Sequence, residues 1–270
     1  MQGFEFHKPA SMAEAASALA GASDGRALAG GQSLLAAMKL GLSAPSDLVD
    51  LSGLAELRGV RVEGGRVVIG AMTTHATVAA SPELQRTIPG LAELAAHIGD
   101  RAVRTMGTIG GSIANADPAA CYPSAVVALG ATIRTDRRTI PGETFFKGVY
   151  ETALEPGELI VAVEFPIPRK AAYEKFKQPA SRFPLVGVFV ALMDDGARVG
   201  VTGAAPCAFR ATAVEQALSG EWSAAAAERA GVSAHGLNTD LHGSAEYRAH
   251  LIPVLAGRAL ARADQLSAAH

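Results

Sequence analysis

The sequence predicts an α+β protein, with a larger N-terminal α+β domain and a smaller C-terminal domain in which a β-hairpin precedes helices. Two observations lead to this prediction. Up to residue 165, short alternating apolar segments are interspersed with segments of helical periodicity. After the proline-bearing segment 166–170, one long hairpin pattern is followed by helical patterns alone. The length of 270 residues suits two packed domains or one large one.

The first elements are short. Residues 4–6 alternate as a strand would, and Ser11 with Glu14 fits a capping box, in which both side chains satisfy free amides at the start of a helix. Gly21 ends that helix, and residues 26–29 predict a strand that runs into a pair of glycines.

The middle of the chain alternates between the two kinds of pattern. Gly64-Gly65 predicts a tight hairpin turn, because glycine readily takes the positive φ that such turns require. Pro166 and Pro168 close the last strand of this part. The predicted elements are a hairpin (60–63 and 66–69), a helix (82–98), a glycine-rich turn (107–111), a buried helix (125–129) and two strands (131–135 and 159–165).

Residues 166–170 are predicted to be a linker. Beyond it, residues 185–193 and 198–202 predict a hairpin, and two helices follow at 211–218 and 223–230. The last predicted helix is capped by Ser244 and has Pro253 as an expected kink.

Composition excludes several classes of function. The net charge is −2 and no block of Lys and Arg stands out, so a nucleic-acid partner is not expected. No signal peptide and no apolar run of about 20 residues is found, which predicts a cytoplasmic protein without a membrane span. Cys121 and Cys207 lie far apart, too few for an iron–sulfur cluster, and the six histidines considered show no metal-ligand spacing. No metal site and no catalytic residue is therefore assigned to this chain.

Two glycine pairs carry the functional signal. They lie in the segments 29–33 and 108–112, each where an extended segment turns. Successive N–H groups in such turns form a nest for anionic oxygens, and a hydrogen bond to a charged group contributes about 1.5–3 kcal/mol. A single glycine pair is more often only a turn, as Gly64-Gly65 illustrates, and neither segment fits a Rossmann or P-loop motif. The residues alone therefore predict two anion cradles that could hold a nucleotide.

Longer motifs resemble the flavoprotein family of the molybdenum hydroxylases, which includes the medium subunits of aerobic carbon monoxide dehydrogenases and the flavin domains of xanthine dehydrogenases. The similar segments occur in order over nearly the whole chain. They are AGGQSLL (29–35), DLVDL (47–51), GAMTTH (70–75), GTIGGSIANADP (107–118), KFKQPASR (175–182) and the final helix from residue 246.

The resemblance implies a vanillyl-alcohol-oxidase (PCMH)-type FAD-binding domain of two subdomains over residues 1–170. It also implies a C-terminal domain, residues 171–270, in which a three-stranded antiparallel sheet with helices covers the flavin. By position, it implies that FAD is bound by Ala29, Gly30, Gly31, Gln32, Ser33, Leu34, Thr108, Ile109, Gly110, Gly111, Ser112, Asp117, Cys121, Ile160, Lys177 and Phe183.

Three of these residues have alternative interpretations. Lys177 would be a cation that favours reduced flavin, or only an exposed strand lysine. Phe183 would lie against the isoalloxazine, or only in the core. Cys121 stands where xanthine dehydrogenase relatives carry an aspartate that touches FAD, so a polar contact is lost unless Asp117, Ser112 or water replaces it, and a redox-sensitive thiol is gained. His75 is interpreted as a local hydrogen-bonding residue.

The function implied by the resemblance is electron relay. A large partner chain would hold a molybdenum cofactor and a small partner chain two [2Fe–2S] clusters, in a heterotrimer that is often doubled. This chain would pass electrons through FAD to a quinone, NAD or oxygen. The alternatives are a stand-alone FAD oxidoreductase of the same fold and a non-enzymatic nucleotide-binding protein.

Overall fold

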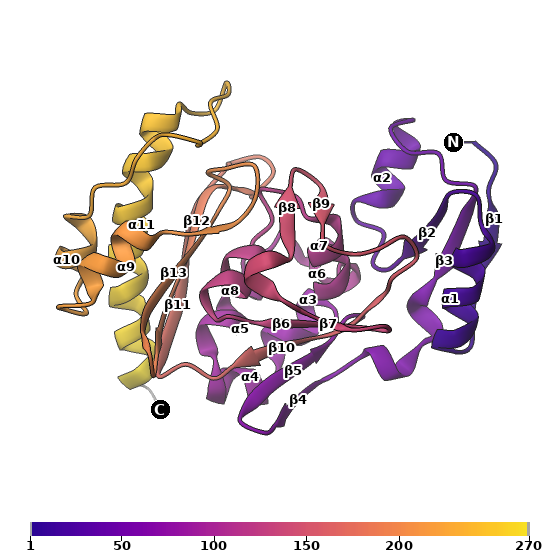
Figure 1. Cartoon of the computed structure of the whole chain (residues 1–270), viewed down its shortest axis with the longest axis horizontal. Helices are drawn as coiled ribbons and strands as arrows, with labels where there is room; N and C mark the ends of the chain where they lie inside the picture. Colours follow the sequence, from indigo (N-terminus) through magenta and orange to yellow (C-terminus); the bar gives the residue numbers. More distant parts are fainter. Residues whose placement is uncertain (1, 269–270) are drawn as a thin grey trace.

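The computed structural model describes residues 2–268 and has three parts side by side along its longest axis (Figure 1). The first part, the N-terminal module, is a parallel sheet of order β1-β3-β2 with two α-helices. Its elements are β1 (Glu5–His7), α1 (Met12–Gly21), β2 (Gly25–Leu28), α2 (Leu34–Lys39), β3 (Asp47–Asp50) and the 3-10 turns η1 (Leu51–Gly53) and η2 (Ala55–Leu57).

The predicted capping box is present with one difference. Ser11 Oγ accepts the Glu14 amide at 3.2 Å, whereas the Glu14 carboxylate accepts the amide of Ala10 rather than that of Ser11.

The second part, the middle module, is built on an antiparallel sheet of order β4-β5-β10-β6-β7. The predicted hairpin at its edge is confirmed, with Gly64 and Gly65 both at positive φ. The strands are β4 (Val60–Glu63), β5 (Arg66–Gly70), β6 (Thr132–Thr135), β7 (Thr139–Pro141) and β10 (Ile160–Pro166), and β8 (Phe146–Gly148) pairs separately with β9 (Glu151–Thr152). The helices are α3 (His75–Ala80), α4 (Pro82–Thr87), α5 (Pro89–Ala96), α6 (Arg101–Met106), α7 (Ile109–Asn115), α8 (Tyr122–Ala128) and the 3-10 turn η3 (Gly142–Thr144).

Two predictions for this module were wrong in detail. The single helix expected over 82–98 is two helices, because Pro89 disfavours the helical conformation at Ile88, which has φ −138° and ψ 66°. The glycine-rich segment 107–111 is not a free turn, because Gly110 and Gly111 form the first turn of α7.

The third part, the C-terminal module, is an antiparallel sheet of order β11-β12-β13-β14 followed by helices. The prediction of three strands was wrong by one: β14 pairs with β13 through only two residues, too few to show an alternating pattern. The elements are β11 (Lys170–Lys177), β12 (Pro184–Met193), β13 (Gly196–Thr202), β14 (Phe209–Arg210), α9 (Thr212–Leu218), α10 (Ala224–Glu228) and α11 (Ala245–Ala268).

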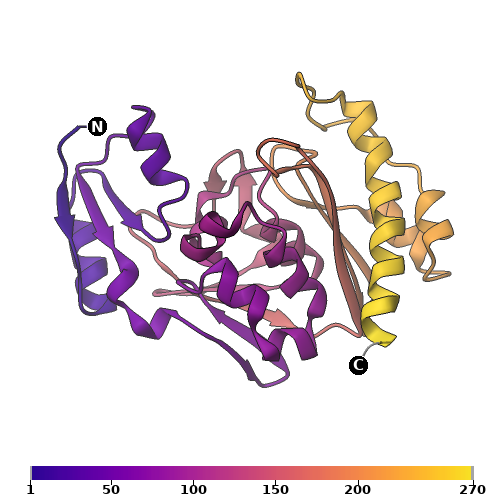
Figure 2. The ribbon, with the colours of Figure 1, turned by 180° about the vertical axis from the view of Figure 1, so that it is seen from behind.

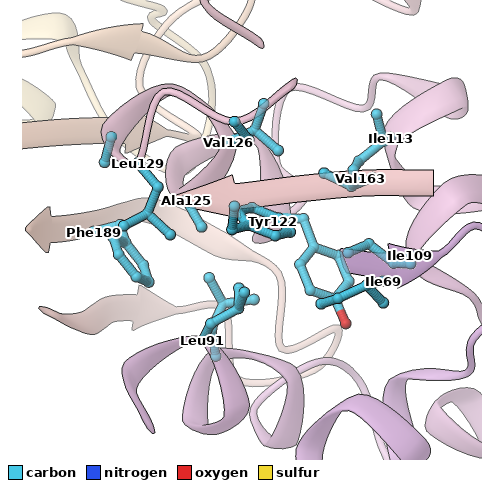
Figure 3. Packing of buried hydrophobic residues seen from close by; sticks show 14 of the residues in the cluster. Ile69, Leu91, Ile109, Ile113, Tyr122, Ala125, Val126, Leu129, Val163 and Phe189 are labelled. Atoms are coloured by element: carbon cyan, nitrogen blue, oxygen red, sulfur yellow. The ribbon is translucent and has the colours of Figure 1, made fainter. Parts of the chain in front are cut away.

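The C-terminal sheet is covered on both faces. Helix α11 packs on β11 and β12 from outside, while α5 and α8 of the middle module pack on the sheet from inside (Figure 2). The inner side chains belong to the main hydrophobic core, in which Phe189 of β12 lies beside Leu91, Ala125 and Leu129 (Figure 3). The middle and C-terminal modules therefore share one core, and the α+β prediction is confirmed.

No helix among residues 2–268 is both long and apolar enough to cross a membrane.

Candidate functional site

A cavity of about 460 Å³ is lined by all three modules. Its volume lies in the range of about 300–1,000 Å³ that is usual for cofactor sites. Most of the residues predicted to bind FAD line it: Ala29, Gly30, Gly31, Gln32, Ser33, Leu34, Thr108, Gly110, Gly111, Ser112, Asp117, Cys121, Ile160 and Phe183. Ile109 does not, because its side chain is fully buried in the core, and Lys177 does not, because it is exposed at the end of β11.

The first glycine loop, residues 29–33 between β2 and α2, presents unpaired amides. Within residues 2–268, the N–H groups of Gly30, Gly31, Gln32 and Ser33 donate to no protein acceptor. Gly31 has φ +70°, a conformation that glycine adopts without strain. Ser33, at the start of α2, makes no side-chain cap. This loop therefore has the free donors of an anion cradle.

The second glycine loop does not form the second cradle that was expected. Thr108 caps α7, and its Oγ1 accepts the Gly111 amide at 3.1 Å. Three further amides donate to backbone oxygens: that of Ile109 to Thr73, that of Gly110 to Ala71 and that of Ser112 to Thr108. All four amides are thus bound within the protein.

The glycines of both loops allow close packing of backbone on backbone. A Cβ at Gly30 would overlap the carbonyl oxygen of Met106, and one at Gly111 would lie 3.2 Å from the Ala29 Cβ. A Cβ at Gly110 would lie 2.6 Å from that of Ala71. The second loop therefore supports the first, and among the amides of residues 108–112 only that of Thr108 has no protein acceptor in the described chain.

His75 lies at the wall of the cavity and is 4% exposed. Its Nδ1 has no hydrogen-bond partner in the described part of the chain, and its ring lies 5.4 Å from that of Tyr122, whose hydroxyl is also unpaired. Burial, together with the nearby Arg104, lowers the pKa of His75 to about 4, so the ring is neutral at pH 7. A buried polar group without a partner is unusual, and a polar bound group or water would satisfy it.

Asp117 and Phe183 supply a carboxylate and an aromatic ring to the lining. Asp117 Oδ1 accepts the amide of Ala119 at 2.8 Å, and its Oδ2 lies 3.4 Å from the hydroxyl of Tyr150. The carboxylate raises the pKa of that phenol. Phe183 is 46% exposed, and with Ile160 it offers the apolar contact area that a flat ring system needs.

Lys175 is the lysine in the cavity wall. Its Nζ donates to the carbonyl oxygens of His97 at 2.9 Å and Arg182 at 2.7 Å, and lies 3.5 Å from Cys121 Sγ. Strand alternation alone would place Lys177 on the same face as Lys175. A register shift between residues 176 and 177 breaks this alternation, and Lys177 lies outside the lining.

Glu158 is buried beside the cavity and bound from four directions. It accepts from Arg138 Nε and Nη2 at 2.9 Å each, from Thr135 Oγ1 at 2.8 Å and from the Glu155 amide at 2.7 Å. The Arg138 hydrogen bonds lower the pKa of Glu158 to about 2. This cluster holds the start of β10, where Leu159 and Ile160 line the cavity.

The cavity lies between modules and is lined by unpaired amides and by apolar and aromatic side chains. Such a site is typical of a protein that holds a cofactor with both an anionic and an apolar part. The family "FAD binding domain in molybdopterin dehydrogenase" matches residues 2–168, and "CO dehydrogenase flavoprotein C-terminal domain" matches residues 171–263.

Individual relatives match over their whole length. The carbon monoxide dehydrogenase medium chain of Hydrogenophaga pseudoflava is 37% identical over 95% of this chain and 96% of its own. The nicotine 6-hydroxylase medium subunit of Paenarthrobacter nicotinovorans is 34% identical over 96% of both.

Solved structures agree with this result. A carbon monoxide dehydrogenase structure from H. pseudoflava, which lacks the Mo-pyranopterin moiety of the molybdenum cofactor, has a chain that superposes with a TM-score of 0.90 at 38% identity and 98% coverage of both chains. Quinoline 2-oxidoreductase from Pseudomonas putida 86 gives 0.88 at 33% identity, again with 98% coverage of both.

The chain therefore belongs to the FAD-binding medium subunits of the molybdenum hydroxylases, a family of oxidoreductases, and FAD is its cofactor.

Proposed function

We propose that this chain relays electrons inside a molybdenum hydroxylase complex, from [2Fe–2S] clusters on a small partner chain to an external acceptor. The observation that carries the proposal is the cavity, whose walls come from both matched domains and which offers free amides and an aromatic surface in one continuous site. A bound flavin supplies the redox chemistry, since it can take up electrons and release them to a second partner. The residues of this chain bind, orient and shield it.

The free amides of Gly30, Gly31, Gln32 and Ser33 fit the diphosphate of FAD. Nothing on the first loop carries a positive charge, so binding there depends on N–H dipoles. Ile160 of the middle module and Phe183 of the C-terminal module fit the ring system, whereas the loop belongs to the N-terminal module. The hydroxyls of Thr108 and Ser112 and the carboxylate of Asp117 are among the polar side chains of the lining.

The relatives support an assignment of the other cofactors to partner chains. The relatives are medium chains and subunits of dehydrogenases and hydroxylases, and one solved relative is a carbon monoxide dehydrogenase that lacks the Mo-pyranopterin moiety of the molybdenum cofactor. We therefore assign the molybdenum cofactor to a large partner chain and the iron–sulfur clusters to a small one, in a cytoplasmic heterotrimer. We also place the division of this chain at 170/171, as the ranges of the two family matches suggest.

The titratable side chains of the cavity support relay rather than substrate chemistry. His75 is neutral and buried, and Glu158 is held by Arg138. Glu158 is ionised and bound at neutral pH, and His75 is shielded from solvent.

The decisive experiment is co-purification of the tagged chain from its native host, followed by identification of the bound chains and metals. We expect one large chain with molybdenum, one small chain with iron, and flavin reduction when the complex turns over. The isolated, FAD-loaded chain should reduce dyes but oxidise no organic substrate. Substrate turnover by the isolated chain would instead identify a stand-alone flavoenzyme, and a folded chain without flavin absorbance a structural nucleotide-binding protein.

A further inference from the structure

The wall of the cavity formed by the β11–β12 hairpin carries a positive charge whose surroundings are unusual. Lys175 Nζ has three protons, and three neighbours lie within reach: two carbonyl oxygens and the Cys121 thiol. None of these three is a carboxylate. The ammonium is thus fully coordinated, held in one place, and not neutralised by any of its direct contacts.

The carboxylates of the cavity wall are engaged elsewhere. Glu158 is paired with Arg138, and Asp117 is bound by the Ala119 amide and faces Tyr150. Arg182, whose own carbonyl accepts from Lys175, directs its guanidinium to the carbonyl oxygen of Gly99 at 3.2 Å, again without a carboxylate. The hairpin wall therefore carries the positive charges of Lys175 and Arg182, and the polar contacts of both side chains are to carbonyl oxygens and a thiol.

We propose that Lys175, held in place by Cys121 and two carbonyl oxygens, is the residue that sets the reduction potential of the bound flavin in this chain. The inference rests on the proposed FAD site and deepens it. A fixed positive charge beside a redox group stabilises its electron-rich, reduced form, and the effect is large where the surroundings exclude water. Because all three protons of Lys175 are already used, it acts through its charge and not through a hydrogen bond to the flavin.

The chemical nature of residue 121 determines how much of the electric field of the Lys175 ammonium is cancelled before it reaches the flavin. An uncharged thiol accepts from the ammonium without cancelling it, whereas a carboxylate at the same position would form an ion pair and cancel most of the field. Cys121 is 5% exposed, so little water would screen such a pair. The structure thus assigns the identity of residue 121 a role in tuning the potential through its neighbour.

The test compares midpoint potentials of FAD-loaded full-length variants by anaerobic titration against a reference dye. Lys175→Met should lower the midpoint potential of the flavin by about 30 mV or more. For a two-electron couple, this shift corresponds to a fall of about tenfold in the ratio of reduced to oxidised flavin at a fixed solution potential. Lys175→Arg, which keeps the charge, should stay close to the wild-type value. Lys147→Met, at an exposed position outside the lining, is the control for loss of a distant positive charge.

Cys121→Asp provides an independent test that leaves Lys175 in place. The midpoint potential of the flavin should be lower in Cys121→Asp than in Cys121→Ser. This pair tests the proposal even if Lys175→Met does not bind FAD. Equal potentials for Lys175→Met and Lys175→Arg, or for Cys121→Asp and Cys121→Ser, with flavin bound in each, would overturn the proposal. Failure of the relay function is a separate result: wild-type protein that binds no FAD, or FAD that its partner chains do not reduce.

Discussion

At the scale of single residues, Gly30 and Gly31 adjoin in sequence but are required for different reasons. Gly31 has a positive φ, so the requirement is one of backbone conformation. Gly30 has no such φ, and the space that its Cβ would fill is taken by the carbonyl oxygen of Met106. The first glycine therefore fixes how the loop of free amides sits on the middle module, and the second fixes its curvature.

Gly30→Ala should accordingly weaken both folding and FAD binding. We expect a loss of about 1–3 kcal/mol in the free energy of unfolding of the apo-protein, the usual cost of overpacking, and purification with substoichiometric flavin. Urea denaturation and the ratio of flavin to protein absorbance measure the two effects. Gly220→Ala is the matched control, because a Cβ there meets nothing within 4 Å. Normal flavin content in Gly30→Ala would mean that the loop does not depend on this contact.

Glu158 gives a prediction about pH. The pKa of this carboxyl is about 2 in the folded protein against an ordinary value of 4.5, so its contribution to stability is complete above pH 4.5 and is lost as the pH falls toward 2. Glu158→Gln should remove about 1.5–3 kcal/mol at pH 7, the range for hydrogen bonds to a charged group, and should make stability fall less steeply in acid. Thermal unfolding of both proteins between pH 7 and pH 3 measures this. Parallel curves for the two proteins would contradict it.

Single residues also show where sequence reasoning stopped. The glycine loops, Asp117, Cys121, Ile160 and Phe183 were predicted by motif and do line one cavity. Lys175 was missed, because the motif resemblance assigned the flavin contact to Lys177, which lies outside the lining. The role of His75 in the wall was also missed, since it depends on contacts with α6 and α8 that no local pattern shows.

At the scale of elements, local signals were reliable where the chemistry was local. The turn at Gly64-Gly65 and the cap at Ser11 follow from backbone conformation and a hydrogen bond over three residues, and both are present. The pattern over 82–98 kept its apolar periodicity across Pro89, so periodicity alone could not show the break. Strand β14 has only two residues, and it is recognised as a strand by its pairing with β13, which the sequence does not show.

The β11–β12 hairpin turn, residues 178–183, is the element expected to respond most to the cofactor. It contacts the middle module through Arg182, and three of its residues line the cavity. FAD binding should slow amide hydrogen exchange in this turn and in loop 29–33 at least tenfold, because a ligand that binds only the closed form suppresses local opening. The β4–β5 turn at Gly64-Gly65 lies outside the lining and should exchange at the same rate with and without FAD. Protection of loop 29–33 alone would show that the hairpin turn does not cover the cofactor.

At the scale of the whole molecule, the two matched domains are not separable bodies. Ala171, Tyr173, Phe189 and Ala191 of the C-terminal sheet belong to the same buried cluster as the helices and strands of the middle module. The backbones also touch, since a Cβ at Gly200 would overlap the carbonyl oxygen of Ser124. The boundary between the two matched families, at residues 168–171, is therefore not a boundary between two hydrophobic cores.

We therefore expect the full chain to unfold in one cooperative transition, and residues 1–170 alone to be unstable, because their removal from the C-terminal sheet would expose an apolar face that the complete protein buries. Calorimetry of the intact apo-protein should give equal calorimetric and van't Hoff enthalpies, and the 1–170 fragment should aggregate or bind a hydrophobic dye. Mixing it with residues 171–270 during refolding should restore FAD binding, since the cavity draws residues from both. Two separate transitions in the intact chain, or a stable 1–170 fragment that binds FAD with native affinity, would show that the shared core is not essential and that the hairpin wall contributes little to holding the cofactor.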